Sequence, residues 1–546
     1  MIQYKKITRF TLLLMVMGIA LSCTKLNEKL QSTLTNAQVT ASFGSAGTAL
    51  LLAGAYADLT FLTAQDQLFS LEENSTDESL VPTRGGDWDD NGVWRVVHNH
   101  TWNADHGQVL STFNSLNKLS FDATNVLAFN PTKPQAAQAK VLRAYALFYL
   151  MDLYGQYPIR NPGDNLLLAP VVRTGQVGID SIINDITTSL PDLPAPGDPT
   201  IINSDVAKVL LMKCYLQKGV FLNPASPTFD PADLAQVISL GEGIIASNKY
   251  SYEANYFDNF TPTNHSAKEA IFLYPNTGGV GTNHAGVEAR WNMTLHYNSY
   301  TPNNPNAGWN GFTTISDFYN SFNTTATPTV YDHGDTLIIT DTRLGGRVRS
   351  NPVSVSKSGI RPGFLIGQQY NENGVALKDR KGFPLSYTPA IAADMIENGS
   401  NLEVTGIRVV KYVPDYAFYG GPANNDFMIF RYPDVVLMVA EAQLRINPAD
   451  PAALTAVNDL RTARGAPALA TLPLTNTSNV EDPGTLLAER GREFYWESSR
   501  RSDLLRFGMY LKTWQYKPTD DPKNLLFPIP NQALAANPNL KQNPGY

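Results

Sequence analysis

Apolar residues recur at helical spacing in several segments of the chain. In residues 140–155 they form one continuous stripe, which consists of Val141, Leu142, Tyr145, Phe148, Tyr149 and Leu153. The stretch after Asp450-Pro451 shows the same period and ends at Arg464-Gly465. An aspartate followed by proline favours a helix start, and glycine favours a helix stop. The pattern therefore predicts amphipathic helices in both segments.

Three further segments carry helix signals. Asp230-Pro231 and Asp482-Pro483 have the composition of helix starts, and Ser204 can cap a helix over residues 205–219. Residues 432–446 are apolar almost all round, which predicts a buried helix. Within that helix Glu441 and Arg445 would lie one turn apart and form an ion pair.

Residues from about 250 to 425 have a different pattern. They are rich in Asn, Gly, Thr, Pro and Tyr, with short strand-like runs at 271–274, 336–339 and 407–412. No flexible linker separates this part from the helical segments, so we expect one integrated body. The sequence predicts a mostly α fold, in which tetratricopeptide-like helix pairs form a scaffold beside an irregular region of loops and short strands.

Composition excludes several classes of protein. The 546 residues include 42 basic and 49 acidic side chains, and the net charge of -7 gives no support to nucleic-acid binding. The mean hydropathy of -0.20 excludes a protein that crosses a membrane many times. Two cysteines cannot form a disulfide framework, and Cys214 lies in a helical pattern where we expect a buried thiol.

The first residues are typical of an exported lipoprotein. Three basic residues precede the apolar run 10–21, which is short for a transmembrane helix and typical of a signal peptide. Ser22-Cys23-Thr24 follows, so we expect residues 1–22 to be removed and Cys23 to carry lipid, although an incidental cysteine at this place is the alternative. Removal of the three basic residues would change the net charge to -10, from 39 basic and 49 acidic residues. The polar stretch 24–38 would then serve as a tether.

Two groups of aromatic residues lack helical spacing. One contains Trp88, Trp94 and Trp102, and the other contains Trp291, Tyr297, Tyr300 and Trp309. A flat ring can cover the C–H face of a sugar while charged groups bond its hydroxyls. The alternative is that these rings anchor loops within the interior. The candidate ligand-binding residues are Asp77, Arg84, Trp88, Trp94, Trp291, Tyr297 and Trp309.

No motif points to catalysis, a metal or a cofactor. His98, His100 and His106 lack a matching cysteine or carboxylate, and the acidic residues 72–78 do not follow a calcium-loop pattern. Glu489, Glu493 and Glu497 would line one helix face among arginines, which favours ion pairing over the facing carboxylates of a glycosidase. We therefore expect a protein that is not an enzyme and has no cofactor.

Many short pieces of this sequence resemble, in order, the SusD/RagB family of outer-membrane nutrient-uptake lipoproteins. The pieces are Cys23, Leu51-Leu52-Ala53-Gly54-Ala55-Tyr56, Arg84-Gly85-Gly86-Asp87-Trp88, Leu142-Arg143-Ala144-Tyr145, Leu153-Tyr154-Gly155, Tyr157-Pro158, Asn425-Asp426-Phe427, Phe430-Arg431-Tyr432, Ala440-Glu441-Ala442, Glu489-Arg490-Gly491-Arg492-Glu493-Phe494, Arg500-Arg501-Ser502-Asp503-Leu504-Leu505-Arg506, Phe527-Pro528-Ile529-Pro530 and Gln542-Asn543-Pro544-Gly545-Tyr546. They cover nearly the full length of the chain.

This resemblance implies a surface protein that binds and delivers a nutrient. The family consists of outer-membrane lipoproteins that sit as lids over a SusC-like TonB-dependent transporter and most often bind glycans. It implies an N-terminal region 23–230 and a C-terminal region 231–546 in one body, and it favours Asp77, Arg84 and Trp88 as ligand contacts. The alternatives are a peptide-binding member of the same system, a lipid-anchored secreted hydrolase and a purely structural surface protein.

Overall fold

The computed structural model describes residues 36–280, 286–299, 308–322, 341–345, 360, 362–370, 375–418, 421–518 and 520–546. Cys23, Tyr300 and the predicted strand 336–339 lie outside these residues. Within them, no helix is both long enough and apolar enough to cross a membrane.

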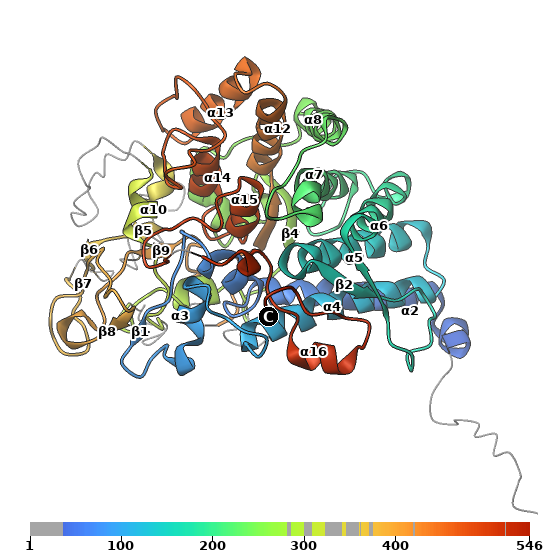
Figure 1. Ribbon diagram of the computed structural model, residues 1–546, viewed down its shortest axis with the longest axis horizontal. Helices are drawn as coiled ribbons and strands as arrows, with labels where there is room; N and C mark the ends of the chain where they lie inside the picture. The colour runs from blue at the N-terminus through green and yellow to red at the C-terminus, as the bar shows by residue number, and fades with distance from the viewer. Residues whose placement is uncertain are drawn as a thin grey trace, which may run out of the picture.

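Long helices form a curved row along one side of the molecule (Figure 1). Consecutive members pack against one another, and helix α12 joins the row by packing on α8. The helices of the row are α2 (Asn36–Ala57), α4 (Gly107–Ala128), α5 (Lys133–Tyr154), α6 (Gly175–Thr187), α7 (Ser204–Leu222), α8 (Pro231–Ala246), α12 (Tyr432–Ile446) and α13 (Pro451–Ala463). The predicted helix-rich fold is confirmed. Residues 36–38, which we expected in a polar tether, belong to α2.

The ends of these helices follow local sequence chemistry. Helix α5 begins with a capping box between Thr132 and Gln135 and ends at Gly155, whose φ of 68° is left-handed. A side chain on Gly155 would also meet Leu526 at 2.8 Å. Asp230 and Asp450 cap α8 and α13 as predicted, each accepting a hydrogen bond from a backbone N–H at 2.8 Å.

Two predicted helix starts were wrong by a few residues. Asn203, rather than Ser204, caps α7 by accepting from the N–H of Asp205 at 3.0 Å. Asp482 accepts from the N–H of Gly484 in a turn, and Thr485 caps helix α14 (Leu486–Phe494). In both cases a neighbouring residue with an equally suitable side chain is better placed.

The other side of the molecule consists of loops, short helices and two-stranded sheets (Figure 1). The sheets are β1 (Thr83–Arg84) with β8 (Ile396–Glu397), β2 (Gln156–Ile159) with β3 (Val171–Thr174), β4 (Ala270–Tyr274) with β10 (Phe427–Arg431), β5 (Gly363–Leu365) with β9 (Arg408–Val410), and β6 (Gly367–Gln368) with β7 (Ser386–Tyr387). Only β1 and β8 pair in parallel among these described strands. The predicted strands at 271–274 and 407–412 are confirmed by β4 and β9.

The short helices include two that lie between the row and the loops, α14 and α15 (Figure 1). The short α-helices besides α14 are α3 (Val93–His98), α9 (Ala289–Asn292), α10 (Ser316–Asn320), α15 (Arg500–Arg506) and α16 (Asn531–Ala536). A π-helical turn, η2 (Ser70–Asn74), packs on α15.

Buried ion pairs hold α14 and α15 in the core. Glu489 lies 2.7 Å from Arg343, and Glu493 lies 2.7 Å from Arg464. On α15, Arg500 contacts Asp77 at 2.5 Å. All of these side chains are buried, so the predicted ion-paired helix is confirmed. The pairs join the N-terminal, middle and C-terminal thirds of the chain. Cys214 is also buried, as predicted.

The pair Arg500–Asp77 makes a testable contribution to stability. Replacing Arg500 by methionine leaves the Asp77 carboxylate buried without its cation, so we expect a loss of about 3–5 kcal/mol in the free energy of unfolding. Urea denaturation measures this loss. The control Lys133→Met breaks an exposed pair with Asp192 at 4.0 Å and should cost less than about 0.5 kcal/mol. Equal effects of the two substitutions would contradict the prediction.

Glu73 on η2 predicts a loss of stability as the pH rises from about 4.5 to about 7. Burial raises the pKa of this carboxyl from 4.5 to about 7. The folded protein therefore favours the protonated form, and this contribution is complete below pH 4.5 and is lost as the pH rises through about 7. The loss should approach roughly 3 kcal/mol. Denaturation across this range should show a smaller fall for Glu73→Gln than for the wild type, whereas the exposed control Glu242→Gln should follow the wild type.

Candidate functional site

The seven predicted ligand-binding residues differ in how deeply they are buried. Asp77 and Trp291 have no exposed surface, and Asp77 is held by Arg500. Neither side chain can contact a ligand in this arrangement, because the interior packs around both of them. Asp77 can be buried because its charge is paired with Arg500, which is more than four hundred residues away along the chain.

Arg84 and Trp94 lie just beneath the surface. Arg84 is buried and donates hydrogen bonds to the carbonyl oxygens of Thr405 at 2.8 Å and Leu402 at 3.2 Å. The Trp94 ring packs edge-on against Trp88, and its Nε1 donates to Asp90 at 2.7 Å. These two residues are placed to support neighbouring segments, and not to meet a ligand directly.

Trp88, Tyr297 and Trp309 are half-buried and lie close together. Nε1 of Trp88 donates to the carbonyl of Trp309 at 2.7 Å, and the hydroxyl of Tyr297 donates to Asp87 at 2.5 Å. Gly311 allows this approach, because a Cβ there would lie 2.3 Å from the Trp88 ring. The fold thus brings together aromatic residues more than two hundred positions apart in the sequence.

Arg380 completes this group and was not identified from the sequence. Its guanidinium carbon lies 3.9 Å from the centre of the Tyr297 ring, a cation–π contact. Its Nη2 lies 3.4 Å from Asp87, and the side chains of Arg380 and Asp87 are 46% and 47% exposed. We call Asp87, Trp88, Tyr297, Trp309 and Arg380 the aromatic–arginine cluster. The one sequence signal for Arg380 was its place beside Lys381-Gly382 in a polar loop.

A buried glutamate fixes the position of Arg380. Oε1 of Glu403 accepts from Nε of Arg380 at 2.6 Å, and its Oε2 lies 2.7 Å from Nε2 of His296. Burial lowers the pKa of His296 to about 4, so the ring is neutral at pH 7. Nδ1 of His296 accepts from the N–H of Asn298 at 3.0 Å, which leaves the proton on Nε2 to be donated to Glu403. Glu403 is therefore an ionised acceptor.

The cluster has the chemistry of a carbohydrate contact. Trp88, Tyr297 and Trp309 are half-buried aromatic residues, and Asp87 and Arg380 offer an acceptor and several donors beside them. Asp87 and Arg380 are half-exposed, so the ion pair between them contributes little to stability. Each side chain can therefore leave the other and bond hydroxyl groups of a ligand at little cost.

The histidines considered as metal ligands are used within the fold. His98 bonds the carbonyl of Ser79 at 3.0 Å, His100 bonds that of Ser75 at 2.8 Å, and His106 bonds Val93 at 3.0 Å. No group of three or more His, Cys, Asp or Glu side chains is arranged to hold a metal in the described part of the chain.

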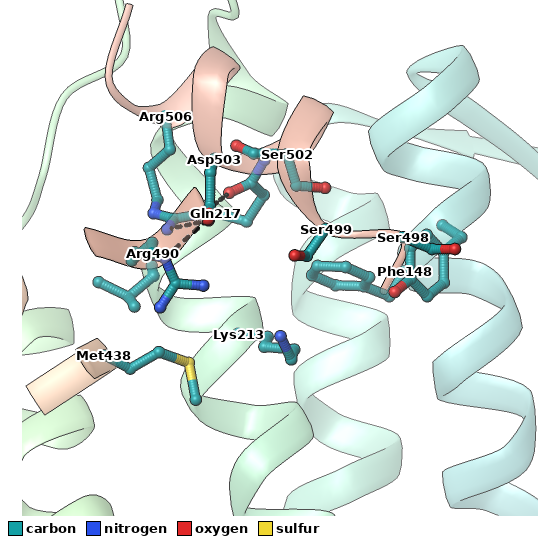
Figure 2. A pocket seen from close by; sticks show the side chains of 12 residues that line it. Phe148, Lys213, Gln217, Met438, Arg490, Ser498, Ser499, Ser502, Asp503 and Arg506 are labelled. Atoms are coloured by element: carbon teal, nitrogen blue, oxygen red, sulfur yellow. Dashed lines mark hydrogen bonds and ion pairs between the residues drawn. The ribbon is translucent and has the colours of Figure 1, made fainter. Parts of the chain in front are cut away.

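Two cavities lie away from the cluster. One is a groove of about 300 Å³ between α4, β2 and α16. The other, of about 20 Å³, lies between α5, α7, α12, α14 and α15, where Arg490 and Arg506 converge on Asp503 at 2.8 and 2.7 Å (Figure 2). This second space is about the size of one water molecule. Neither cavity is lined by a predicted ligand-binding residue.

Known proteins with similar sequences or folds point to one family. The starch-binding protein SusD of Bacteroides thetaiotaomicron is 25% identical over 447 residues, which cover 78% of this chain and 75% of that protein. A SusD homologue of the same species superimposes with a TM-score of 0.68 at 16% identity, covering 94% of this chain and 99% of the other. The surface glycan-binding protein A of Bacteroides uniformis gives a TM-score of 0.63 at 16% identity, covering 91% and 98%.

The family model extends over more than half of the chain. The model that describes the SusD family matches residues 268–546, a stretch that includes α12–α16 and the Tyr297, Trp309 and Arg380 members of the cluster. The structural matches show that the fold extends over the N-terminal helices as well. The chain therefore belongs to the SusD family.

Proposed function

We propose that the protein is a cell-surface lipoprotein that captures an oligosaccharide and delivers it, without cleaving it, to a SusC-like TonB-dependent outer-membrane transporter. Membership of the SusD family supports this function, as do two similar proteins, one starch-binding and one glycan-binding. Lipid on Cys23 would hold the protein at the outer membrane, facing outward.

The aromatic–arginine cluster is the observation that carries this proposal. Its three rings come from irregular segments and remain partly exposed, although the neighbouring Trp94 is buried. Half-buried aromatic residues grouped beside a half-exposed ion pair form a surface that can meet a partner. A sugar would stack against the open parts of the rings, and Asp87 and Arg380 would select among hydroxyl groups.

Three carboxyl groups that could be considered for acid catalysis, Glu403 beside the cluster and the buried pair Glu489 and Glu493, are poorly suited to it. Glu489 and Glu493 are buried, and although burial alone would raise their pKa values, the surrounding arginines lower them well below the ordinary value. Burial alone would also raise the pKa of Glu403. Hydrogen bonds from Arg380 and His296 outweigh this effect, and the pKa is lowered. A glycosidase needs a carboxyl with a raised pKa to donate a proton to the leaving group. None of these three groups meets that requirement.

Calorimetric titration with a panel of oligosaccharides tests the binding site. We expect a dissociation constant in the micromolar range or weaker, about -8 kcal/mol or less favourable, because the cargo must be released. Arg380→Ala should weaken binding about tenfold, since it removes a charged donor, and Tyr297→Ala should weaken it similarly.

The matched control is Arg173→Ala on β3, which should bind like the wild type. Thermal melting of each variant separates lost binding from lost folding. Binding of a peptide pool in place of every glycan, or release of shorter sugars during incubation, would contradict the proposal.

The proposed anchor has its own test. Cys23→Ser removes the sulfur that would carry lipid, so the protein expressed with its leader should move from the membrane fraction to the soluble fraction. Mass spectrometry of the wild-type protein should find an N-terminal lipidated Cys23. A wild-type chain that still carries residues 1–22 would contradict this assignment.

A further inference from the structure

A protruding loop between β2 and β3 exposes consecutive leucines. Residues 161–169 are all exposed. The exposed fractions are 62% for Leu166, 93% for Leu167 and 65% for Leu168, and Val171 follows at 55%. We call residues 160–170 the leucine loop. Runs of exposed apolar side chains in a folded protein mark a surface that meets something apolar.

This concentration of apolar surface is specific to the loop. The described residues contain fourteen exposed large apolar side chains, and four of them fall within residues 166–171. The others, such as Val280, Val375 and Ile446, are scattered singly along the chain, as is ordinary for a protein surface.

Internal hydrogen bonds hold the loop in its shape. Arg160 donates to the carbonyl oxygens of Leu168 at 2.7 Å and Asn165 at 3.2 Å. The side chain of Asn165 accepts from the N–H of Leu167 at 2.9 Å. At the base, Asn539 donates to the carbonyl of Pro170 at 2.9 Å. Arg160, the only cationic residue of the loop, thus bonds backbone carbonyl groups, and the leucine side chains remain exposed to solvent.

The groove of about 300 Å³ begins at the base of this loop. Arg160 and Pro170 line it, together with Pro158 and Ile159 from β2 and the partly exposed Phe121 of α4. The apolar surface therefore continues from the tip of the loop into a recess.

The position and composition of the loop favour a lipid surface as the occupant. Asp164 is the only charged residue between positions 161 and 171. In Figure 1 the loop after β2 and the beginning of α2 both lie at the lower edge of the molecule. Asn36, at the start of α2, is thirteen residues from Cys23. A fully extended chain of that length reaches about 45 Å. A lipid on Cys23 could therefore hold this edge close to a membrane.

We propose that the leucine loop is a second membrane contact, which inserts Leu166, Leu167 and Leu168 into the lipid surface beside the anchor. This inference rests on the proposed anchor only for the distance to the membrane. Two contacts would fix the orientation of the protein, because one tether allows it to rotate freely. Leucines suit this role, because burying their apolar surface in lipid is favourable and does not require a partner of defined shape.

Vesicle binding of the chain from residue 24 onward tests the loop without the anchor. Vesicles of phosphatidylethanolamine and phosphatidylglycerol should retain this chain in a co-sedimentation assay. The triple change Leu166→Ser, Leu167→Ser and Leu168→Ser should lower the partition coefficient at least about tenfold, since three apolar side chains are lost. The matched control changes Val280, Val375 and Ile446 to serine and should partition like the parent chain.

A fluorescent reporter locates the contact. In Leu167→Trp, vesicles should shift the added emission to shorter wavelength, and lipids brominated in their acyl chains should quench it. No shift, or equal partition of the leucine and control variants, would overturn the inference. Loss of transporter binding without any loss of vesicle binding would also overturn it, in favour of a protein docking surface. Glycan titration of the same variants should be unchanged, which separates this result from failure of the proposed function.

Discussion

The buried ion pairs around α14 and α15 are the constraint on which the rest of the structure depends. Glu493 alone contacts Arg343, Arg431 and Arg464, which come from three separate parts of the chain. Removing such charges from water is costly, and this cost is recovered only when every partner is in place. Buried ion pairs restrict the arrangement more than apolar contacts do, because each charge needs a partner within hydrogen-bond distance. They therefore oblige distant segments to meet at a single arrangement.

The aromatic–arginine cluster is a consequence of that arrangement. Its members are at positions 87, 88, 297, 309 and 380, and Arg84 reaches across to Thr405. These five residues lie outside the helices and strands, so their relative positions depend on the core beneath them. Loops held on a rigid scaffold commonly carry binding residues.

The helices could be predicted because their signals are local. Asp230, Asp450 and Gly155 each act within one turn of the helix that they begin or end. The depth of an aromatic or acidic residue in an irregular segment carries no comparable signal. Trp88 and Trp291 look alike in the sequence, yet one is half-buried and the other is fully enclosed. Asp77 and Arg380 show the same limit. The position of Asp77 depends on Arg500, hundreds of residues away, and that of Arg380 depends on Glu403, tens of residues away. Neither partner belongs to a repeating pattern.

The two proposed contact surfaces occupy different sides of the fold. The segments that form the cluster lie on the loop-rich side, near β1, β8 and α3, whereas the leucine loop follows β2 on the helical side (Figure 1). The helical row is continuous from α2 to α13 and is joined to the loops by buried ion pairs, so close packing connects the two surfaces. An orientation fixed at the membrane would therefore also fix the direction in which the cluster faces, as the proposed delivery to a neighbouring channel requires.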